Sequence, residues 1–475
     1  MKNNQAEEAL CYIDGSWRKT ERPGQVTSPY SGEIVTKVFQ AELSDVKEAI
    51  CSAVNAKERV AALAGFERAS ILRRAAALLR ESSAEIAWTL ASETGKTIRD
   101  CDQELVRAAE VLDLCAEEAV RIEGRHVPLD ASKVGAERVA IGLRFPVGVV
   151  AAIIPFNAPV NLTCHKVGPS FAAGNTTIIK SPPQAPRTSQ LIVEVLAKAG
   201  FPKGSIALLH GDGSVGEALV TDAAVDFISF TGSPRTGVAI KAVTGLRGCI
   251  LELGGVGPTI VHSDADLDLA AQMCTQAGFR LAGQSCASVQ NLFVHESRAD
   301  DFTNRILALV GKLRTGDPLS RDTDIGPVIN SQAAERIVSW VQEARDAGAE
   351  ILCGGTREGN IVEPTLVSRA TEGMKVVCEE VFGPVIVIRP YEALEDVYRW
   401  IQASNLGLNC GLFTKAHAVA LEAVRQLPCA SVVVNGTCTF RPDQIPYGGL
   451  RGSGYGRESP HDSIRAMTQE RFLVL

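Results

Sequence analysis

The sequence predicts an α/β protein built on parallel sheets, and two observations support this prediction. From residue 147 onward, short runs rich in β-branched residues alternate with stretches of helical periodicity. Strands joined by crossover helices have this pattern. The alternation then occurs a second time, from about 256 to 445. Because 475 residues are enough for about three domains, we expect two α/β domains, each with its own parallel sheet.

The strands of these two blocks are expected in short apolar runs. In the first block they are VGVVAAIIP, TTIIKSP, SIALLHG, DFISFTG and GCILELGG, and in the second NLFVHES, VIVIRPYE, GLFTK and SVVVNG. Before these blocks, a β lead-in at 11–17 precedes amphipathic helices such as 44–65 and 103–122, with apolar residues three or four positions apart.

Two further segments predict strands outside the α/β blocks. Residues 126–148 consist of two extended pieces around a polar turn, a pattern that suits a β-hairpin. The C-terminal run QERFLVL is apolar and extended. An exposed edge of this kind promotes aggregation, so we expect the run to pair with another strand.

Composition excludes several classes of partner. The net charge of −7 and the pI near 5.7 argue against a nucleic acid or an anionic membrane. The longest apolar run, 147–154, is too short to cross a bilayer. The start, MKNNQAEEAL, lacks the basic and apolar regions of a signal peptide, so we expect a cytoplasmic protein.

The thirteen cysteines form no CxxC pair, and no His/Cys cluster has zinc spacing. Reduced thiols packed in the core are therefore expected, with no metal site. Cys286 differs from the others because it lies in LAGQSCASVQ, among small and polar residues. It is a candidate nucleophile, with a structural cysteine as the alternative.

Two glycine-rich turns are candidates for binding phosphate. A G-x-G-x-x-G pattern at 211–216 follows a predicted strand, as in dinucleotide-binding turns. No acidic residue follows at the proper distance, and a plain tight turn is about equally consistent. Gly232 and Ser233, in FTGSPRTG, begin a predicted helix whose N–H groups could hold a pyrophosphate.

Asn157 and Glu252 are candidate catalytic residues. Asn157 follows a predicted parallel strand, so its amide would lie at the ligand-binding edge of the sheet and could donate to an oxyanion. The alternative is a turn-forming asparagine. Glu252 ends the apolar run CILE, where burial would raise its pKa and suit a general base. A solvent-facing glutamate is the alternative there.

Taken together, these motifs resemble the aldehyde dehydrogenase superfamily in order and spacing, over nearly the whole chain. Within it, PFN, CHKVGP and FRPDQIPYGG resemble the branch that oxidises lactaldehyde, phosphonoacetaldehyde and, without phosphorylation, glyceraldehyde-3-phosphate. The motifs that carry the resemblance are PFN at 155–157, GS at 232–233, ELGG at 252–255, GQxC at 283–286, EEVFGPV at 379–385 and PYGGLRGSGYGRE at 446–458.

The resemblance implies a mechanism. Cys286 would add to the aldehyde carbon, and the Asn157 amide and the Cys286 N–H would hold the oxyanion. After hydride transfer to the nicotinamide, Glu252 would activate the water that hydrolyses the thioester. Because coenzyme-A-acylating members lack this glutamate, the chain resembles the hydrolytic type, which releases a free acid.

The resemblance also implies an NAD or NADP site. Pro183 stands where NAD-preferring members usually have a glutamate that repels a 2′-phosphate, so we expect NADP to be accepted at least as well as NAD. Lys180 would pair with that phosphate, and Ser181 could donate to it. The residues implied at the coenzyme are Lys180, Ser181, Gly232, Ser233, Glu380, Phe382, Pro155 and Phe156.

For the substrate, the resemblance implies a small polar or anionic aldehyde. Arg107 and His165 match positions near the substrate, and Arg441 would add a third cationic contact. An ion pair between elements is the alternative for each, and for Arg107 it is equally consistent. Ser285 stands where members that take phosphorylated aldehydes often have arginine, which favours a hydroxy- or carboxy-aldehyde.

The resemblance implies three structural parts. Residues 1–125 and 147–255 would bind the coenzyme, 256–445 would form the catalytic domain, and 126–146 with 459–475 would form an oligomerisation arm. In a homodimer or homotetramer, another subunit would then pair with the C-terminal run.

Two other functions compete with a dehydrogenase. A thiol esterase would use the same acyl-enzyme chemistry, but it would not need Lys180, Gly232, Ser233 and Glu380. A non-catalytic structural protein of this fold would not need Cys286.

Overall fold

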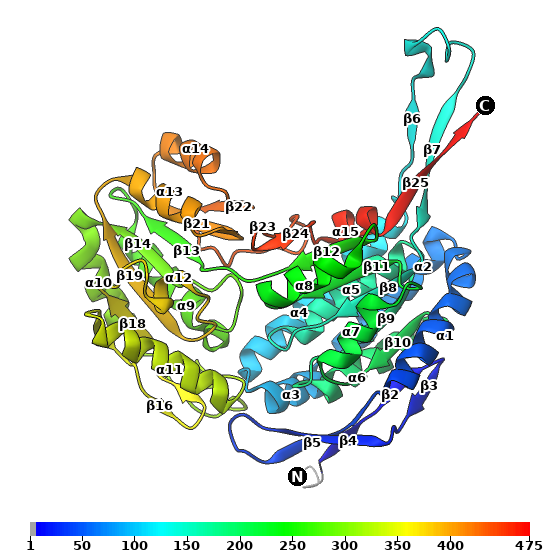
Figure 1. The fold of residues 1–475 in the computed structure, drawn as a ribbon. Coiled ribbons are helices and arrows are strands. Elements are labelled where there is room, and N and C mark those ends of the chain that lie inside the picture. Colours follow the sequence, from blue (N-terminus) through cyan, green and yellow to red (C-terminus); the bar gives the residue numbers. More distant parts are fainter. Residues whose placement is uncertain (1–5) are drawn as a thin grey trace.

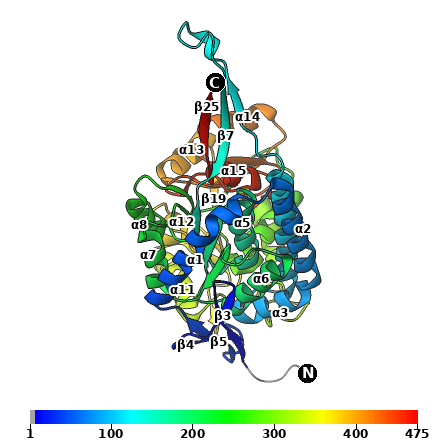
Figure 2. The ribbon, with the colours of Figure 1, turned by 90° about the vertical axis from the view of Figure 1, so that its right-hand side faces the viewer.

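The computed structural model describes residues 6–475. Two α/β units lie side by side, and a narrow β arm projects away from both of them in both views (Figures 1 and 2). The first five residues, on which part of the signal-peptide prediction rests, lie outside the described residues. None of the helices within 6–475 is long and apolar enough to span a membrane.

The first unit is built on an eight-stranded sheet in the order β24-β12-β11-β8-β9-β10-β2-β3. Its five central strands, β12 to β10, run parallel, and β24, β2 and β3 are added antiparallel at the two edges. The strands are β2 (Cys11–Ile13), β3 (Ser16–Arg18), β8 (Val149–Ile153), β9 (Thr176–Lys180), β10 (Ile206–Leu209), β11 (Phe227–Thr231), β12 (Gly248–Glu252) and β24 (Gly454–Tyr455).

Helices cover both faces of this sheet because the strands are apolar on both sides. In β8, Val149 and Ala151 pack into one core cluster, and Val150 and Ala152 pack into another. One face carries α1 (Leu43–Ala61), α7 (Gly213–Thr221) and α8 (Pro234–Thr244). The other carries α2 (Gly65–Glu81), α3 (Ser83–Thr94), α4 (Ile98–Ala119), α5 (Pro159–Ala172) and α6 (Pro186–Ala199).

The strand order contains a topological switch. From β8 the chain adds β9 and β10 on one side, and then returns to add β11 and β12 on the other side. In open α/β sheets, ligands bind outside the carboxyl ends of the strands at such a point. The crevice beside β8 and β11 is therefore the expected binding site.

The second unit contains a seven-stranded sheet in the order β15-β18-β19-β14-β13-β21-β22, parallel except for β15. Its strands are β13 (Pro258–Val261), β14 (Asn291–His295), β15 (Glu350–Cys353), β18 (Thr365–Ser368), β19 (Val385–Tyr391), β21 (Asn409–Phe413) and β22 (Ser431–Val434). Its helices are α9 (Leu267–Phe279), α10 (Glu296–Val310), α11 (Ser331–Asp346), α12 (Lys375–Cys378), α13 (Leu394–Ala403) and α14 (His417–Gln426).

The arm consists of β6 (Arg125–Val127), β7 (Ala140–Pro146) and β25 (Thr468–Val474). β6 and β7 form the predicted hairpin, and β25 pairs antiparallel with β7 from Thr468–Pro146 to Val474–Ala140. The C-terminal run thus pairs with a strand, as predicted. The partner is a strand of the same chain, and pairing of the arm with another subunit stays a prediction.

Smaller elements complete the chain. A three-stranded sheet of β1 (Glu7–Ala9), β5 (Ile34–Gln40) and β4 (Arg22–Thr27) lies below the first unit in Figure 1. Helix α15 (Pro460–Ala466) leads into β25. The remaining short elements are η1 (Leu129–Ala131), η2 (Arg280–Gly283), β16 (Arg357–Glu358), β17 (Ile361–Val362), β20 (Leu406–Gly407) and β23 (Leu450–Arg451).

Candidate active site

A cavity of about 530 Å³ opens at the carboxyl edge of the first sheet. Its wall on that side comes from the loops after four parallel strands, β8, β9, β11 and β12. These loops supply Asn157, Pro183, Ser233 and Gly254, respectively, among other residues. The cavity therefore lies where the strand order predicts a ligand site.

The opposite wall comes from the second unit. Cys286 lies in the loop before β14, and Glu380 and Phe382 lie in the loop before β19. The second sheet thus presents the amino ends of its strands to the carboxyl ends of the first. Residues from the two units, far apart in sequence, meet across one cavity.

The Cys286 loop has an unusual backbone. Leu281 and Ala282 have φ values of 58° and 51°, and Gly283 has a φ of 70°. A Cβ on Gly283 would lie 2.0 Å from the Gly383 carbonyl oxygen, so only glycine fits there. The half-buried Cys286 side chain faces the cavity, and its Sγ lies 3.4 Å from the Tyr447 hydroxyl. Burial raises the pKa of the thiol to about 11.

Asn157 is held close to the Cys286 loop. Its Nδ2 donates a hydrogen bond of 3.0 Å to the Gln284 carbonyl, and Lys96 donates to its backbone oxygen. The start of the helix after Asn157 is fixed by Glu104, which accepts hydrogen bonds from the N–H groups of Val160 and Asn161. The amide is therefore positioned by both units.

Glu252 is buried at the end of β12, and neither of its carboxylate oxygens has a hydrogen-bond partner within residues 6–475. Burial raises its pKa well above the usual range, and the charge of Glu458 adds to this effect. Glu458 itself accepts hydrogen bonds from Lys166 at 2.7 Å and Arg441 at 3.0 Å. The solvent-facing alternative for Glu252 is therefore wrong.

Glu380 lies across the cavity, where it accepts a hydrogen bond of 3.3 Å from the Gly255 N–H. Burial raises its pKa to about 7. A Cβ on Gly254 would lie 2.3 Å from a Glu380 oxygen, so this glycine leaves room for the carboxylate. Phe156 and Phe382 touch edge to face nearby, with ring centroids 5.9 Å apart.

Gly232 and Ser233 line the cavity at the start of α8. The Ser233 side chain caps that helix by accepting a hydrogen bond of 3.3 Å from the Thr236 N–H. The helix N-terminus thus faces the cavity, an arrangement that favours an anion.

Lys180 ends β9 and Ser181 follows it, but neither is among the residues that line the cavity. Lys180 is mostly buried, and burial lowers its pKa to about 8. The Ser181 hydroxyl is buried and lies 2.7 Å from His210 Nδ1. In this arrangement the hydroxyl has no access to a nucleotide, so its predicted contact with a 2′-phosphate is not supported. Pro183 lines the cavity and is exposed.

The G-x-G-x-x-G turn lies elsewhere. Gly211, Gly213 and Gly216 follow β10, which is two strands away from the switch point, and none of them lines the cavity. Asp212 caps α7 by accepting a hydrogen bond of 3.0 Å from the Ser214 N–H. The motif therefore forms a tight turn between β10 and α7, which was the alternative to a dinucleotide-binding turn.

A second cavity, of about 550 Å³, lies beside the first and is lined by Arg107 and Arg441. Arg441 lines both cavities. Arg107 binds the Asp443 carboxylate through two hydrogen bonds, of 2.6 and 3.1 Å. Arg107 thus forms an ion pair between elements, which was the alternative to a contact with substrate. Its side chain also lines the second cavity, so a contact with substrate stays a prediction.

His165 and Ser285 line neither cavity. His165 is buried, with Nε2 at 2.8 Å from Asp443 Oδ1, and burial lowers its pKa. The predicted direct contact of His165 with substrate is therefore not supported; the ring lies behind Asp443. The Ser285 hydroxyl accepts a hydrogen bond of 3.4 Å from the Ala287 N–H.

The comparison that decides the family covers almost the whole chain. Residues 17–473 match the model of the aldehyde dehydrogenase family. The chain belongs to this family. It is an oxidoreductase that acts on aldehydes, with NAD or NADP as the electron acceptor.

Relatives within the aldehyde dehydrogenase family match over nearly their full length. The 3-sulfolactaldehyde dehydrogenase of Priestia aryabhattai is 40% identical over 472 residues, which are 99% of this chain and 98% of the relative. Aldehyde dehydrogenase 21 of Physcomitrella patens, solved with the reaction product succinate, has a TM-score of 0.96 at 33% identity, covering 99% of this chain and 98% of that one.

A third similar protein is the NADP-dependent glyceraldehyde-3-phosphate dehydrogenase of Bacillus halodurans C-125, solved with NADP. Its TM-score is 0.96 at 34% identity, covering 98% of this chain and 99% of that one. The aldehyde dehydrogenase fold predicted from the motifs is therefore confirmed.

The sequence analysis of this aldehyde dehydrogenase did not predict four polar residues that lie at the candidate site. They are Lys166, Asp443, Tyr447 and Glu458, and each lies within hydrogen-bonding distance of a predicted site residue or of its direct partner. A signal was present, because Lys166 stands in helix α5, which contains no aspartate or glutamate that could pair with it. A buried lysine requires a charged partner.

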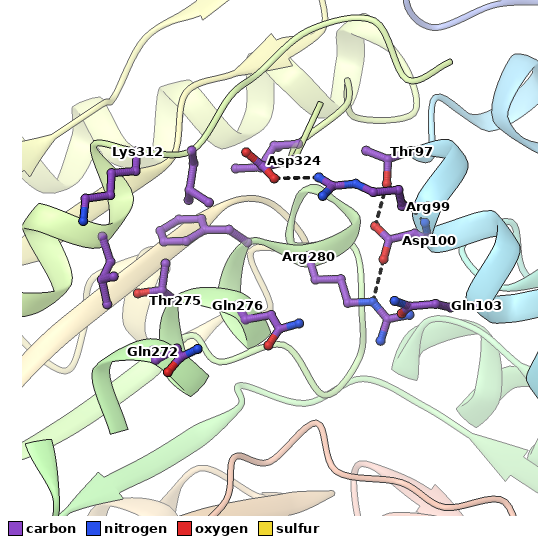
Figure 3. Close-up of a pocket in the computed structure, with 14 residues that line it drawn as sticks. Thr97, Arg99, Asp100, Gln103, Gln272, Thr275, Gln276, Arg280, Lys312 and Asp324 are labelled. Atoms are coloured by element: carbon purple, nitrogen blue, oxygen red, sulfur yellow. Dashed lines mark hydrogen bonds and ion pairs between the residues drawn. The ribbon is translucent and has the colours of Figure 1, made fainter. Parts of the chain in front are cut away.

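A third cleft, of about 430 Å³, shares no lining residue with the first cavity and lies between α4 and α9 (Figure 3). Arg280 donates to Asp100 at 2.7 Å, and Arg99 donates to Asp324 at 2.6 Å. Both ion pairs join the first unit to the second. The polar groups of this cleft therefore fix the units against each other.

Proposed function

We propose that the chain oxidises a small anionic aldehyde to its carboxylic acid, with Cys286 as nucleophile, Asn157 as oxyanion donor and Glu252 as general base. One observation carries this proposal: a thiol, an amide and an unpaired buried carboxyl line the same cavity, at the switch point of the first sheet. Nucleophilic acyl chemistry needs these three groups.

In the first step, the Cys286 thiolate forms a bond to the aldehyde carbon. The carbonyl oxygen becomes an oxyanion, which accepts hydrogen bonds from Asn157 Nδ2 and from the Cys286 N–H. Asn157 Nδ2 has a second hydrogen free for this purpose, because only one is needed for the Gln284 carbonyl. Its fixed position means that the donor need not reorganise during the reaction.

The residues present fit a nicotinamide dinucleotide. The cavity borders the start of α8, whose N–H groups suit a pyrophosphate, and Glu380 can accept hydrogen bonds from ribose hydroxyls. Phe156 and Phe382 supply an apolar surface beside it. A bound nicotinamide would supply the acceptor for the hydride that leaves the former aldehyde carbon.

In the last step, Glu252 takes a proton from a water molecule as that water attacks the thioester carbon. The C–S bond breaks and the acid leaves. The proton on Glu252 then passes to the sulfur of Cys286, which restores the thiol and the carboxylate base. The absence of a protein partner for Glu252 within the described chain supports this role, because the carboxylate is free to bind water. The raised pKa gives it the basicity that proton abstraction requires.

The substrate proposal rests on Arg441, which lines both cavities. Its guanidinium can reach an anionic group on an aldehyde that enters through the second cavity, where Arg107 adds a further positive charge. The similar proteins support this class, since their names specify a sulfonate, the dicarboxylate succinate and a phosphate. We infer the same chemistry for this chain.

Three further assignments belong to this proposal. Residues 1–125 with 147–255 form the coenzyme domain, 256–445 form the catalytic domain, and 126–146 with 459–475 form an arm that joins subunits of a homodimer or homotetramer. The outer edge of β25 supports the arm assignment, because β25 is the end strand of its sheet. Thirteen cysteines, all free thiols, support a cytoplasmic location.

The test measures absorbance of the reduced nicotinamide with each coenzyme. Aldehydes of similar length would be compared: 3-sulfolactaldehyde, the semialdehyde of succinate, glyceraldehyde-3-phosphate and lactaldehyde, with propanal as the neutral control. We expect kcat/KM to be highest for an anionic aldehyde. Equal values for propanal and all anionic aldehydes would refute the substrate class, and no reduction of either coenzyme would refute the activity.

A further inference from the structure

Tyr447 touches the proposed nucleophile. Its hydroxyl lies 3.4 Å from Cys286 Sγ, within hydrogen-bonding distance for sulfur. Both residues line the catalytic cavity, and the Tyr447 side chain is only 4% exposed. Among residues 6–475, no other side chain forms a hydrogen bond with this sulfur.

The position of Tyr447 is fixed from two directions. Its backbone exchanges two hydrogen bonds with Glu458, of 3.0 and 2.6 Å. The Arg441 guanidinium lies 3.8 Å from the centre of the Tyr447 ring, and Arg441 is itself bound to Glu458 at 3.0 Å. The hydroxyl is therefore directed at the sulfur by a rigid frame, not by a flexible loop.

The direction of the hydrogen bond follows from the protonation of the two groups. Burial raises the pKa of Tyr447 well above its usual value, so the phenol keeps its proton at neutral pH. A thiolate has no proton to donate. Once Cys286 ionises, Tyr447 can only be the donor, and a hydrogen bond to the charged form favours that form.

We propose that Tyr447 is a further catalytic residue, whose phenol donates a hydrogen bond to the Cys286 thiolate and thereby increases the thiolate fraction. This inference rests on the proposed role of Cys286 as nucleophile. The hydrogen bond offsets part of the rise that burial causes in the pKa of Cys286, so the thiolate fraction is larger than burial alone would leave.

The other groups around the sulfur do not supply this effect. Glu380 and Glu252 disfavour the thiolate through their negative charges, and only the more distant charge of Arg441 favours it. Cys438 is a neighbouring thiol that is itself buried. Tyr447 is thus the group in direct contact with the sulfur that stabilises its charge.

The test measures how fast iodoacetamide alkylates Cys286 as a function of pH, in the wild type and in Tyr447→Phe. The variant keeps the ring beneath Arg441 and loses only the hydroxyl. Trypsin releases residues 281–298, which contain Cys286 and no other cysteine, so mass spectrometry follows this thiol alone. We expect the midpoint, the pH at which the alkylation rate is half-maximal, to rise by about one unit in Tyr447→Phe. Below that pH, this shift corresponds to about a tenfold loss of thiolate.

A matched control is Tyr391→Phe, which removes a buried hydroxyl that is bonded to His262 at 3.0 Å, away from the cavity. Its midpoint should equal that of the wild type. An unchanged or lowered midpoint in Tyr447→Phe would overturn the proposal. Alkylation needs no turnover, so this result is independent of whether the chain oxidises the proposed aldehydes.

A second measurement does not depend on the folding of a variant. Incorporation of 3-fluorotyrosine at the six tyrosines makes the phenol a stronger donor, so the Cys286 midpoint should fall in the otherwise wild-type protein. The same replacement in Tyr391→Phe should lower the midpoint equally. A midpoint that does not fall would contradict donation by Tyr447.

Discussion

Glu252 and Glu458 are neighbouring buried carboxyls with opposite surroundings. Glu458 accepts hydrogen bonds from Lys166 and Arg441, at 2.7 and 3.0 Å, whereas the two oxygens of Glu252 have no partner in the described chain. Burial alone would raise both pKa values, but the cations around Glu458 hold its pKa well below the usual range. Glu458 therefore stays charged, and Glu252 is left as the group that can take a proton.

Replacement of Glu252 by Gln should separate the two halves of the reaction. We expect a burst of one reduced coenzyme per active site, followed by a steady rate at least about a hundredfold below wild type, because a general base contributes roughly 10²–10⁴-fold. Stopped-flow absorbance measures both phases. Loss of the burst itself would mean that Glu252 acts before hydride transfer.

Glu458→Gln should shift the pH dependence of the steady-state rate. In the wild type, the deprotonated base is present only above the raised pKa of Glu252, so thioester hydrolysis should accelerate as pH rises. Loss of the Glu458 charge removes one cause of that raised pKa, so the profile should move to lower pH. A thermal melt would show whether the variant remains folded, since Lys166 loses its partner. A shift to higher pH would contradict this assignment.

Cys286→Ala should abolish dehydrogenase activity while dinucleotide binding persists. The substitution removes the sulfur but leaves unchanged the loops after β8, β9 and β11, which line the cavity on the side of the first sheet, where we propose that the coenzyme binds. Turnover assays and fluorescence titration with the reduced coenzyme test the two parts. Activity near the wild-type value would exclude Cys286 as the nucleophile.

The coenzyme preference should depend on Pro183, which is exposed at the cavity after β9. Pro183 has no charge that would repel a 2′-phosphate, and the nearby Lys180 can attract one. We expect kcat/KM for NADP to be at least equal to that for NAD, and Pro183→Glu to shift the ratio toward NAD. A wild type that prefers NAD more than tenfold, or a variant without a shift, would refute this prediction.

Arg441→Gln should lower kcat/KM for an anionic aldehyde by about 10–100-fold, because a charge-assisted hydrogen bond contributes roughly 1.5–3 kcal/mol. For propanal the fall should be clearly smaller, so the ratio between the two substrates is the quantity to measure. Arg107→Ala is the companion variant. If its kcat/KM were unchanged for every anionic aldehyde, the predicted contact of Arg107 with substrate would be wrong.

Local patterns were sufficient to predict most of the regular structure. The run VGVVAAIIP contains β8, and the helix expected at 44–65 is α1, Leu43–Ala61. The strand β13, Pro258–Val261, was missed because it is short and begins only three residues after the last glycine of ELGG. The partner of the C-terminal run was also missed, since pairing with β7 joins segments more than 300 residues apart. No local pattern specifies such a contact.

The positions of the candidate site residues could be predicted from the sequence better than the directions of their side chains. Motif order identified Cys286, Glu252 and Asn157, and the fold places all three on one cavity. His165 was predicted from its match to the family motif and Ser181 from its place next to Lys180, yet their side chains point to Asp443 and His210. The direction of a side chain depends on how its element packs. A sequence motif gives the position of a residue along the chain, but not this direction.

Arg441 stands in the wall between the two cavities, and this has a consequence for the order of events during turnover. If the aldehyde uses one entrance and the dinucleotide the other, neither ligand blocks the path of its companion. The acid can then dissociate while the reduced dinucleotide is still bound. A second aldehyde molecule can bind while the reduced dinucleotide is exchanged for the oxidised one. The order of release would then depend on the affinity of each ligand. Competition of the two ligands for one entrance would not limit the turnover rate.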